Sequence, residues 1–144
     1  MKEDNLHCDA QRSLRQAGLS RTPQRVTVLD ILIHAERPVT ASDLMERANG
    51  NLNINKVTVY RIVSTLKQKG IIREIPTNDG INYYEMACVH NPVHPHFYCR
   101  SCKTMHCLEP LTVSNVLDWF AGPHNYTIEE ISIGLSGLCK KCQK

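Results

Sequence analysis

Four cysteines in the C-terminal third of the chain form two Cys-x-x-Cys pairs. Cys99 and Cys102 make the first pair, and Cys139 and Cys142 make the second. Each pair offers two thiolates at the spacing that tetrahedral zinc accepts, and two pairs supply all four sulfur ligands of a closed structural site. The sequence therefore predicts a structural zinc ion held by these four cysteines.

A second run of potential metal ligands lies just before the first pair. Cys88, His94 and His96 combine one thiol with two imidazoles in a Cys-x5-His-x-His spacing. Imidazole suits zinc and iron alike, whereas a thiolate ligand favours zinc. We therefore expect about two zinc ions per chain, one that holds the fold and one that acts as a sensor.

The size and composition of the chain exclude several classes of protein. It has 144 residues, of which 42% are hydrophobic, as expected for one large or two small folded domains. No apolar run approaches the roughly 18 residues of a membrane helix, and the polar start Met1-Lys2-Glu3-Asp4 is unlike a signal peptide. A cytoplasmic protein with no membrane partner is expected. In that reducing compartment, seven cysteines favour metal binding over a disulfide framework.

Helix start and stop signals recur in the first half of the chain. Thr22-Pro23 predicts the start of one helix, and Thr40 with Asp43 predicts a capped second helix. Asn55 predicts the cap of a third helix, which ends at Gly70. The apolar residues of the third helix recur at helical spacing and should form its buried face: Val59, Ile62, Val63 and Leu66.

Two short β-rich segments follow the third helix. Residues 71–75 and 81–84 are joined by Pro76-Thr77-Asn78-Asp79-Gly80, a composition that favours a hairpin turn. Three helices and a hairpin predict a winged helix-turn-helix domain over residues 1–86. Residues 87–144 predict a small α/β dimerisation domain, with a helix around 113–120 and a strand around 131–135. The fold class is therefore α+β.

The third helix carries a basic, polar outer face. The stretch from Asn55 to Lys69 contains four basic residues and no acidic one. Such a face is most often only solvated, but in a winged helix the helix at this place enters the major groove of DNA. The residues expected to contact DNA are Lys56, Thr58, Tyr60 and Arg61 on this helix, with Arg21 and Arg25 adding backbone contacts.

Together these motifs resemble the ferric uptake regulator superfamily of bacterial metal-responsive repressors. The resemblance covers nearly the whole chain and rests on four stretches: Leu19-Ser20-Arg21-Thr22-Pro23-Gln24-Arg25, Thr58-Val59-Tyr60-Arg61, His94-Pro95-His96-Phe97-Tyr98-Cys99-Arg100-Ser101-Cys102, and Cys139-Lys140-Lys141-Cys142. It implies a winged helix coupled to a dimerisation domain, with Tyr60 and Arg61 reading DNA and the four cysteines binding structural zinc.

Within that superfamily, the Cys-x5-His-x-His spacing is similar to the regulatory site of the zinc uptake regulators. Iron and peroxide sensors mostly use histidine and carboxylate ligands at this place, whereas this chain offers Cys88. We expect Glu74 to be the fourth ligand, with Glu85 and His90 as its rivals. By the same resemblance, Cys107 lies where peroxide sensors carry an acidic ligand, so it either approaches the regulatory metal or packs in a strand, and packing is expected. No metal role is expected for His7, Cys8, His106 or His124.

The sequence thus predicts a zinc-responsive repressor that binds operator DNA as a homodimer and controls zinc uptake genes. A two-fold dimer would match a palindromic operator. One alternative is an iron- or peroxide-responsive regulator that uses Glu85, His90, His94 and His96, with Cys88 as a bystander. A remote alternative is a zinc hydrolase, but no convincing general base or substrate pocket is seen, so an enzyme is not expected.

Overall fold

The computed structural model describes residues 8–50, 52–121, 125–129 and 131–143, and these divide into two compact units. The first unit covers Met1–Asn91 and the second Pro92–Lys144. The domain boundary after residue 86 that the sequence indicates stays a prediction. Residues 87–91 group with the first unit, where the backbone N–H of Ala87 donates to the carbonyl of Ile71 at 2.9 Å. In the described part of the chain, no helix is both long and apolar enough to cross a membrane.

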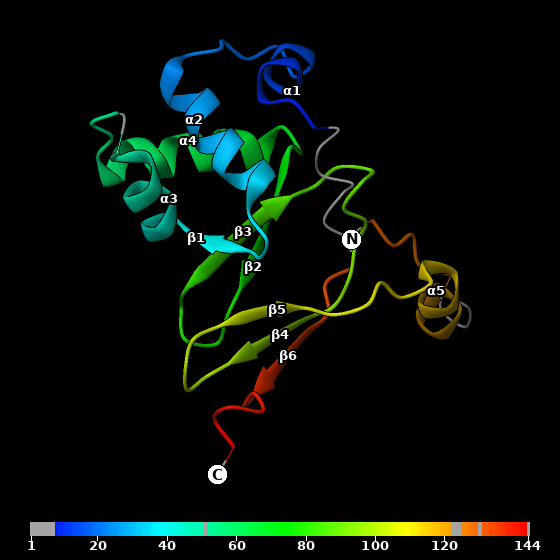
Figure 1. Cartoon of the computed structure of the whole chain (residues 1–144). Helices are drawn as coiled ribbons and strands as arrows, with labels where there is room; N and C mark the ends of the chain where they lie inside the picture. The colour runs from blue at the N-terminus through cyan, green and yellow to red at the C-terminus, as the bar shows by residue number, and fades with distance from the viewer. Residues whose placement is uncertain (1–7, 51, 122–124, 130, 144) are drawn as a thin grey trace. The chain divides into compact units, whose positions relative to one another are not determined.

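Four helices form most of the first unit (Figure 1): α1 Ala10–Gln16, α2 Pro23–His34, α3 Ala41–Ala48 and α4 Lys56–Gln68. The predicted caps of the last three are confirmed. The side chains of Thr22 and Asn55 accept the backbone N–H three residues on, and Thr40 forms a full capping box with Asp43. These bonds lie within single turns, so local sequence is enough to specify where each helix begins.

A three-stranded antiparallel sheet completes the first unit. Its strands β1 (Val39–Thr40), β2 (Ile72–Pro76) and β3 (Asn82–Met86) lie in the order β1-β3-β2. The predicted hairpin is confirmed as β2 and β3. Gly70 has a φ of +70° between α4 and β2, a conformation that favours glycine and lets the chain reverse direction there.

One hydrophobic core holds these elements together. The predicted inner face of α4 is confirmed as buried, and it packs with residues from the other helices and the sheet. The fully buried large side chains include Leu14 of α1, Leu29 of α2, Leu44 of α3 and Leu66 of α4. Since α4 is held by its apolar face, its opposite face is left exposed and its orientation is fixed.

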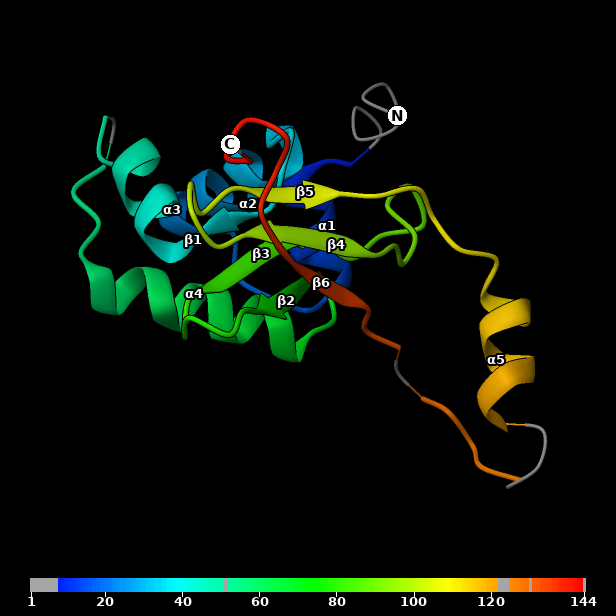
Figure 2. The ribbon, with the colours of Figure 1, turned by 90° about the horizontal axis from the view of Figure 1, so that it is seen from below.

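The second unit is a smaller three-stranded sheet with one helix. Strands β4 (His96–Cys99), β5 (Met105–Cys107) and β6 (Gly134–Gly137) lie in the order β5-β4-β6, and α5 covers Val113–Ala121. Figure 2 shows β4 between β5 and β6, with α5 beyond the end of this sheet. The helix expected at 113–120 is confirmed, whereas the strand expected around 131–135 is shifted to Gly134–Gly137. The position of this strand is set by pairing: β6 pairs in parallel with the short strand β4, and the paired residues run from Gly134 opposite His96 to Gly137 opposite Cys99.

Candidate metal centres and nucleic-acid interface

The two Cys-x-x-Cys pairs come together at one end of the second sheet. Parallel pairing places Cys99, the last residue of β4, opposite Gly137 of β6, two residues before Cys139. The Sγ atoms of all four cysteines lie within 4.8 Å of one another. The Sγ atoms of Cys102 and Cys139 are 3.8 Å apart. Zinc–sulfur bonds of about 2.3 Å in a tetrahedron separate two sulfurs by about 3.8 Å, so this donor set fits a zinc ion.

Hydrogen bonds and burial set the ionisation of these thiols. The backbone N–H of Cys139, then that of Cys102, lowers the pKa of Cys99 to about 6. A hydrogen bond with the Thr104 side chain lowers the pKa of Cys102. A hydrogen bond with Ser101 favours the Cys142 thiolate, but Cys139, burial and the other thiols outweigh it and raise the pKa of Cys142 to about 11. Four thiolates this close together require a cation among them.

A second group of potential ligands forms where β4 begins and β5 ends. Antiparallel pairing sets His96 opposite Cys107. His94 lies beside His96, with ring centroids 4.4 Å apart, and the ligand atoms of His94, His96 and Cys107 lie within 4.8 Å of one another. Both histidines are buried, at 6% and 7% exposure, and Cys107 is exposed. Cys107 lies in strand β5, as expected, but its side chain is exposed rather than packed.

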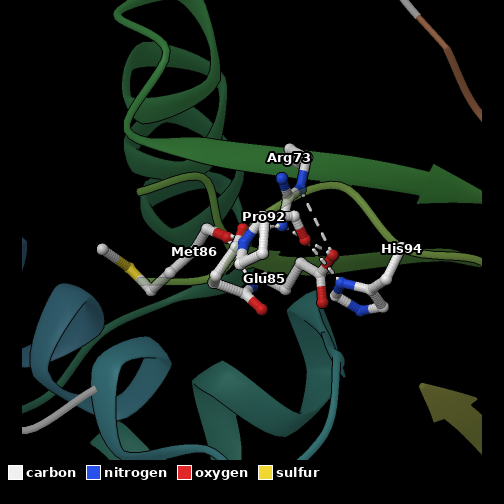
Figure 3. A network of polar contacts seen from close by, with 6 residues as sticks. Arg73, Glu85, Met86, Pro92 and His94 are labelled. Atoms are coloured by element: carbon white, nitrogen blue, oxygen red, sulfur yellow. Dashed lines mark hydrogen bonds and ion pairs between the residues drawn. The ribbon is translucent and has the colours of Figure 1, made fainter. Parts of the chain in front are cut away.

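The hydrogen bond that His94 makes with Pro92 selects which ring nitrogen can bind a metal. Its Nδ1 lies 2.8 Å from the carbonyl oxygen of Pro92, drawn in Figure 3. A carbonyl can only accept, so Nδ1 donates and the lone pair of the neutral ring is on Nε2, which is itself buried. This arrangement is typical of a metal-binding histidine. Two imidazoles and a thiol are a donor set that suits zinc.

The other predicted regulatory ligands belong to the first unit. The Sγ of Cys88 lies 3.3 Å from the Sγ of Cys8, and neither Cys88 nor Glu74 belongs to a group of potential metal ligands among the described residues. Glu74 instead forms an ion pair with Lys67 of α4, at 3.2 Å. Burial, followed by the charge of Glu74 and a hydrogen bond with it, raises the pKa of Tyr84, the cross-strand partner of Glu74, to about 12.

Glu85, one of the rivals to Glu74, lies on the other face of the same hairpin. Its carboxylate is buried and accepts a hydrogen bond from Nε of Arg73, its cross-strand partner, at 3.3 Å. Arg73 also donates from Nη2 to the carbonyl oxygens of Met86 and Asn91, at 3.1 and 2.6 Å; Figure 3 shows Arg73 with Glu85 and Met86. Because successive strand residues face opposite ways, Glu74 and Glu85 cannot serve one site. His90, the other rival, is exposed, and His7 and His124 lie outside the described residues.

The outer face of α4 presents the residues predicted to contact DNA. Lys56, Tyr60 and Arg61 are exposed, and Thr58 is half-buried with its backbone N–H held by the Asn55 cap. The Nζ of Lys56 lies 5.9 Å from the centroid of the Tyr60 ring, a cation–π distance. Arg21 is exposed two residues before α2, and the guanidinium of Arg25 donates to the carbonyl of Ser20.

The model of the Ferric uptake regulator family matches residues 16–136, which is most of the chain. The chain belongs to the ferric uptake regulator family. Its members are metal-binding, DNA-binding transcriptional regulators that act as dimers, and they are not enzymes. The resemblance read from the sequence motifs is thus confirmed at the level of the family, as are the α+β fold class and the absence of an enzymatic role.

Individual relatives represent several branches of this family. The chain is 27% identical over 135 residues to the ferric uptake regulation protein of Campylobacter jejuni, covering 92% of this chain and 85% of that protein. It is 27% identical over 136 residues to the peroxide-responsive repressor PerR of Staphylococcus saprophyticus, covering 94% and 90%. The two identities are equal, so they do not assign the chain to one branch of the family.

Two solved structures have the same fold. The ferric uptake regulator of Vibrio cholerae superposes with a TM-score of 0.78 at 24% identity, covering 91% of this chain and all of that one, 100%. A zinc uptake regulator complexed with zinc and DNA superposes with a TM-score of 0.65 at 21% identity, covering 99% and 95%. At these identities the similarity shows the fold alone.

Proposed function

We propose that this family member is a zinc-responsive repressor, which binds operator DNA when zinc occupies its regulatory site. The observation that carries the proposal is the thiol of Cys107 in one group with the imidazoles of His94 and His96. A thiolate is a soft ligand that zinc accepts readily and that iron and manganese sensors do not need. The four-cysteine cluster supplies the separate, structural zinc site, which makes about two zinc ions per chain.

Glu85 is the fourth regulatory ligand in this proposal, in place of Glu74. Its carboxylate is buried and already oriented by Arg73. The same arginine holds the carbonyl of Asn91, only three residues before His94 in the chain. Three residues span at most about 11 Å, so His94 stays within reach of the hairpin that carries Glu85.

Shared ligands would explain how zinc controls DNA binding. A metal bound by Glu85 of the first unit and by His94, His96 and Cys107 of the second restricts how the two units can be oriented. In a dimer joined through its second units, this restriction sets the spacing of the two α4 helices and favours a palindromic operator. By linkage, operator DNA must tighten zinc binding by the same factor by which zinc tightens DNA binding. The genes repressed would be those for zinc acquisition.

One other function has specific support. Without Cys107, the ligands Glu85, His94 and His96 are a carboxylate and two imidazoles, the harder set that suits iron or manganese. The 27% identity to a peroxide-responsive repressor agrees equally well with this reading. The two functions differ in whether Cys107 is a ligand.

The test is zinc-dependent DNA binding by anaerobically purified dimer. A DNA ligand is first selected from a random pool with the zinc-loaded protein, and its affinity is then measured by fluorescence anisotropy in zinc, iron(II) and manganese(II). We expect zinc to activate the wild type at the lowest free concentration. Cys107→Ala should lose about one zinc per chain and the zinc response, while Cys88→Ala should keep both. An unchanged response in Cys107→Ala, with iron(II) as the better activator, would assign the protein to the iron or peroxide sensors.

A further inference from the structure

The thiols of Cys8 and Cys88 form a pair that the metal sites do not use. Their Sγ atoms lie 3.3 Å apart, although the residues are 80 positions apart in sequence. Neither belongs to a group of potential metal ligands among the described residues. We propose that Cys8 and Cys88 are a redox modification site, at which a hydroperoxide joins them in a reversible intrachain disulfide.

The backbone holds both cysteines in place. Cys8 immediately precedes Asp9, which caps α1 by accepting the backbone N–H of Arg12 at 2.7 Å. Cys88 follows the end of β3 by two residues, and its carbonyl accepts the N–H of Asn91 at 2.9 Å. A disulfide sulfur–sulfur bond is about 2.05 Å long, so side-chain rotation must bring the sulfurs closer by about 1.2 Å.

The surroundings of the pair favour oxidation to a cross-link. Both side chains are half-buried and pack against the core of the first unit. A small oxidant can reach sulfurs at this depth, while larger thiols have less access to the sulfenic acid that forms first. A partner thiol already in contact should therefore capture that sulfenic acid before further oxidation.

The hydrogen bond between the thiols assigns their roles. Cys8 donates its S–H to the Sγ of Cys88. Burial, followed by the hydrogen bond and charge of Cys88, raises the pKa of Cys8 to about 11, so Cys8 keeps its proton at neutral pH. Because Cys8 donates the hydrogen bond and keeps its proton, Cys88 is assigned as the sulfur that reacts first and Cys8 as the resolving thiol.

The reaction balances with hydrogen peroxide as the oxidant. The Cys88 thiolate attacks one peroxide oxygen and breaks the O–O bond. This gives Cys88 sulfenic acid and hydroxide, which is protonated to water. The Cys8 sulfur then attacks the sulfenic sulfur and its hydroxyl leaves as a second water with the Cys8 proton. Two electrons pass from the thiols to the peroxide, and a dithiol reductant reverses the cross-link.

The experiment is peroxide titration of the intact, zinc-loaded dimer, followed by alkylation of free thiols and mass spectrometry of the non-reduced digest. We expect a peptide linked through Cys8 and Cys88 to appear before the four-cysteine site releases zinc, and to disappear after reduction with dithiothreitol. The linked peptide should be absent from Cys8→Ser and Cys88→Ser. It should persist in Cys107→Ser, which removes the remaining thiol outside the zinc cluster.

Several results would overturn the proposal. The first is that both thiols stay open to alkylation after the structural zinc has been lost. The second is that Cys88 is converted to sulfinic acid with no linked peptide, which would mean that Cys8 does not resolve the intermediate. The third is a disulfide between two chains, seen as a dimer on a non-reducing gel. None of these outcomes depends on which metal the regulatory site binds, so this test and that of the proposed function can fail separately.

Discussion

Arg73 and Glu85 face each other across the β2–β3 hairpin, in register and joined by an ion pair of 3.2 Å. One strand position away, Glu74 lies on the opposite face and pairs with Lys67 of α4. The hairpin therefore holds two carboxylates in different roles. Glu74 ties the hairpin to the helix proposed to read DNA, whereas Glu85 is buried and directed away from that helix.

This difference predicts a loss of zinc affinity for one conservative substitution and no change for another. Glu85→Gln removes the charged ligand of the proposed regulatory site but keeps the shape of the side chain. It should weaken regulatory zinc binding by more than the roughly 10- to 100-fold lost when a residue that only hydrogen-bonds to a ligand is removed. Glu74→Gln is the matched control and should leave regulatory zinc affinity unchanged. Competition with a fluorescent chelator measures both. Equal losses in the two variants would show that the effect comes from the hairpin as a whole.

The second unit should depend on its four-cysteine site for folding. Only 53 residues, Pro92–Lys144, make up this unit. Among those whose burial the structure describes, the buried hydrophobic residues are Tyr98, Cys99 and Met105. A structural zinc contributes apparent binding free energies of about 10–16 kcal/mol in small domains, and that energy is largely folding energy. Cys102→Ser should therefore release zinc and unfold the second unit.

Thermal unfolding followed by circular dichroism should show that only the second unit has lost its structure. The first unit, which has its own core, should keep its helical signal and its cooperative transition. A strong chelator at raised temperature should have the same effect on the wild type. If Cys102→Ser keeps one structural zinc and an unchanged transition, three sulfurs and water are enough for folding.

Sequence was most informative where interactions are local. Thr22, Thr40 and Asn55 each cap a helix through a backbone group three residues on, so these starts could be predicted from neighbouring residues alone. Helix α1 was missed although it has the same kind of signal, an Asp9 cap followed by Gly18 at a φ of +71°. Strand β1 has only two residues, and it is defined by pairing with β3 rather than by its own composition.

The candidate regulatory site shows the limit of such inference. His94 and His96 were found from their spacing, because both lie on one short stretch. For Cys107 the sequence favours packing over metal binding, because it joins the histidines only through the pairing of β4 with β5, and this register depends on a turn in which Lys103 adopts a φ of +60°. No local pattern marks that turn. Cys88 had the expected spacing, but its sulfur lies beside Cys8, 80 residues away, and a contact this distant has no local signal.

The exposed face of α4 predicts two kinds of effect on DNA binding. Arg61 points outward from the middle of the helix, where it can reach base edges, whereas Lys56 at the helix start can reach phosphates. Arg61→Ala should cost about 1–3 kcal/mol and relax sequence preference at one position of the selected DNA. Lys56→Ala should weaken binding evenly across sequences and reduce the slope of log affinity against log salt by about 1. Lys69→Ala, at the far end of the helix, is the control.

Helix α5 should form part of the dimer interface. Trp119 is 76% exposed in the single chain and Phe120 is 63% exposed, which is unusual for two adjacent large aromatic residues. Burying most of a tryptophan side chain contributes on the order of 3 kcal/mol. Trp119→Glu should therefore raise the dissociation constant of the dimer by about 100-fold or more, measured by analytical ultracentrifugation.

The matched control for this substitution is Val89→Glu, which places the same charge on a residue of the first unit that is 88% exposed. This variant should remain dimeric. A monomeric Trp119→Glu protein should also lose affinity for a DNA ligand with two half-sites far more than for one with a single half-site, because only the dimer can place two α4 helices on one DNA molecule. A Trp119→Glu protein that stays dimeric would contradict a role for α5 in the interface. The dimer would then have to form through the second sheet.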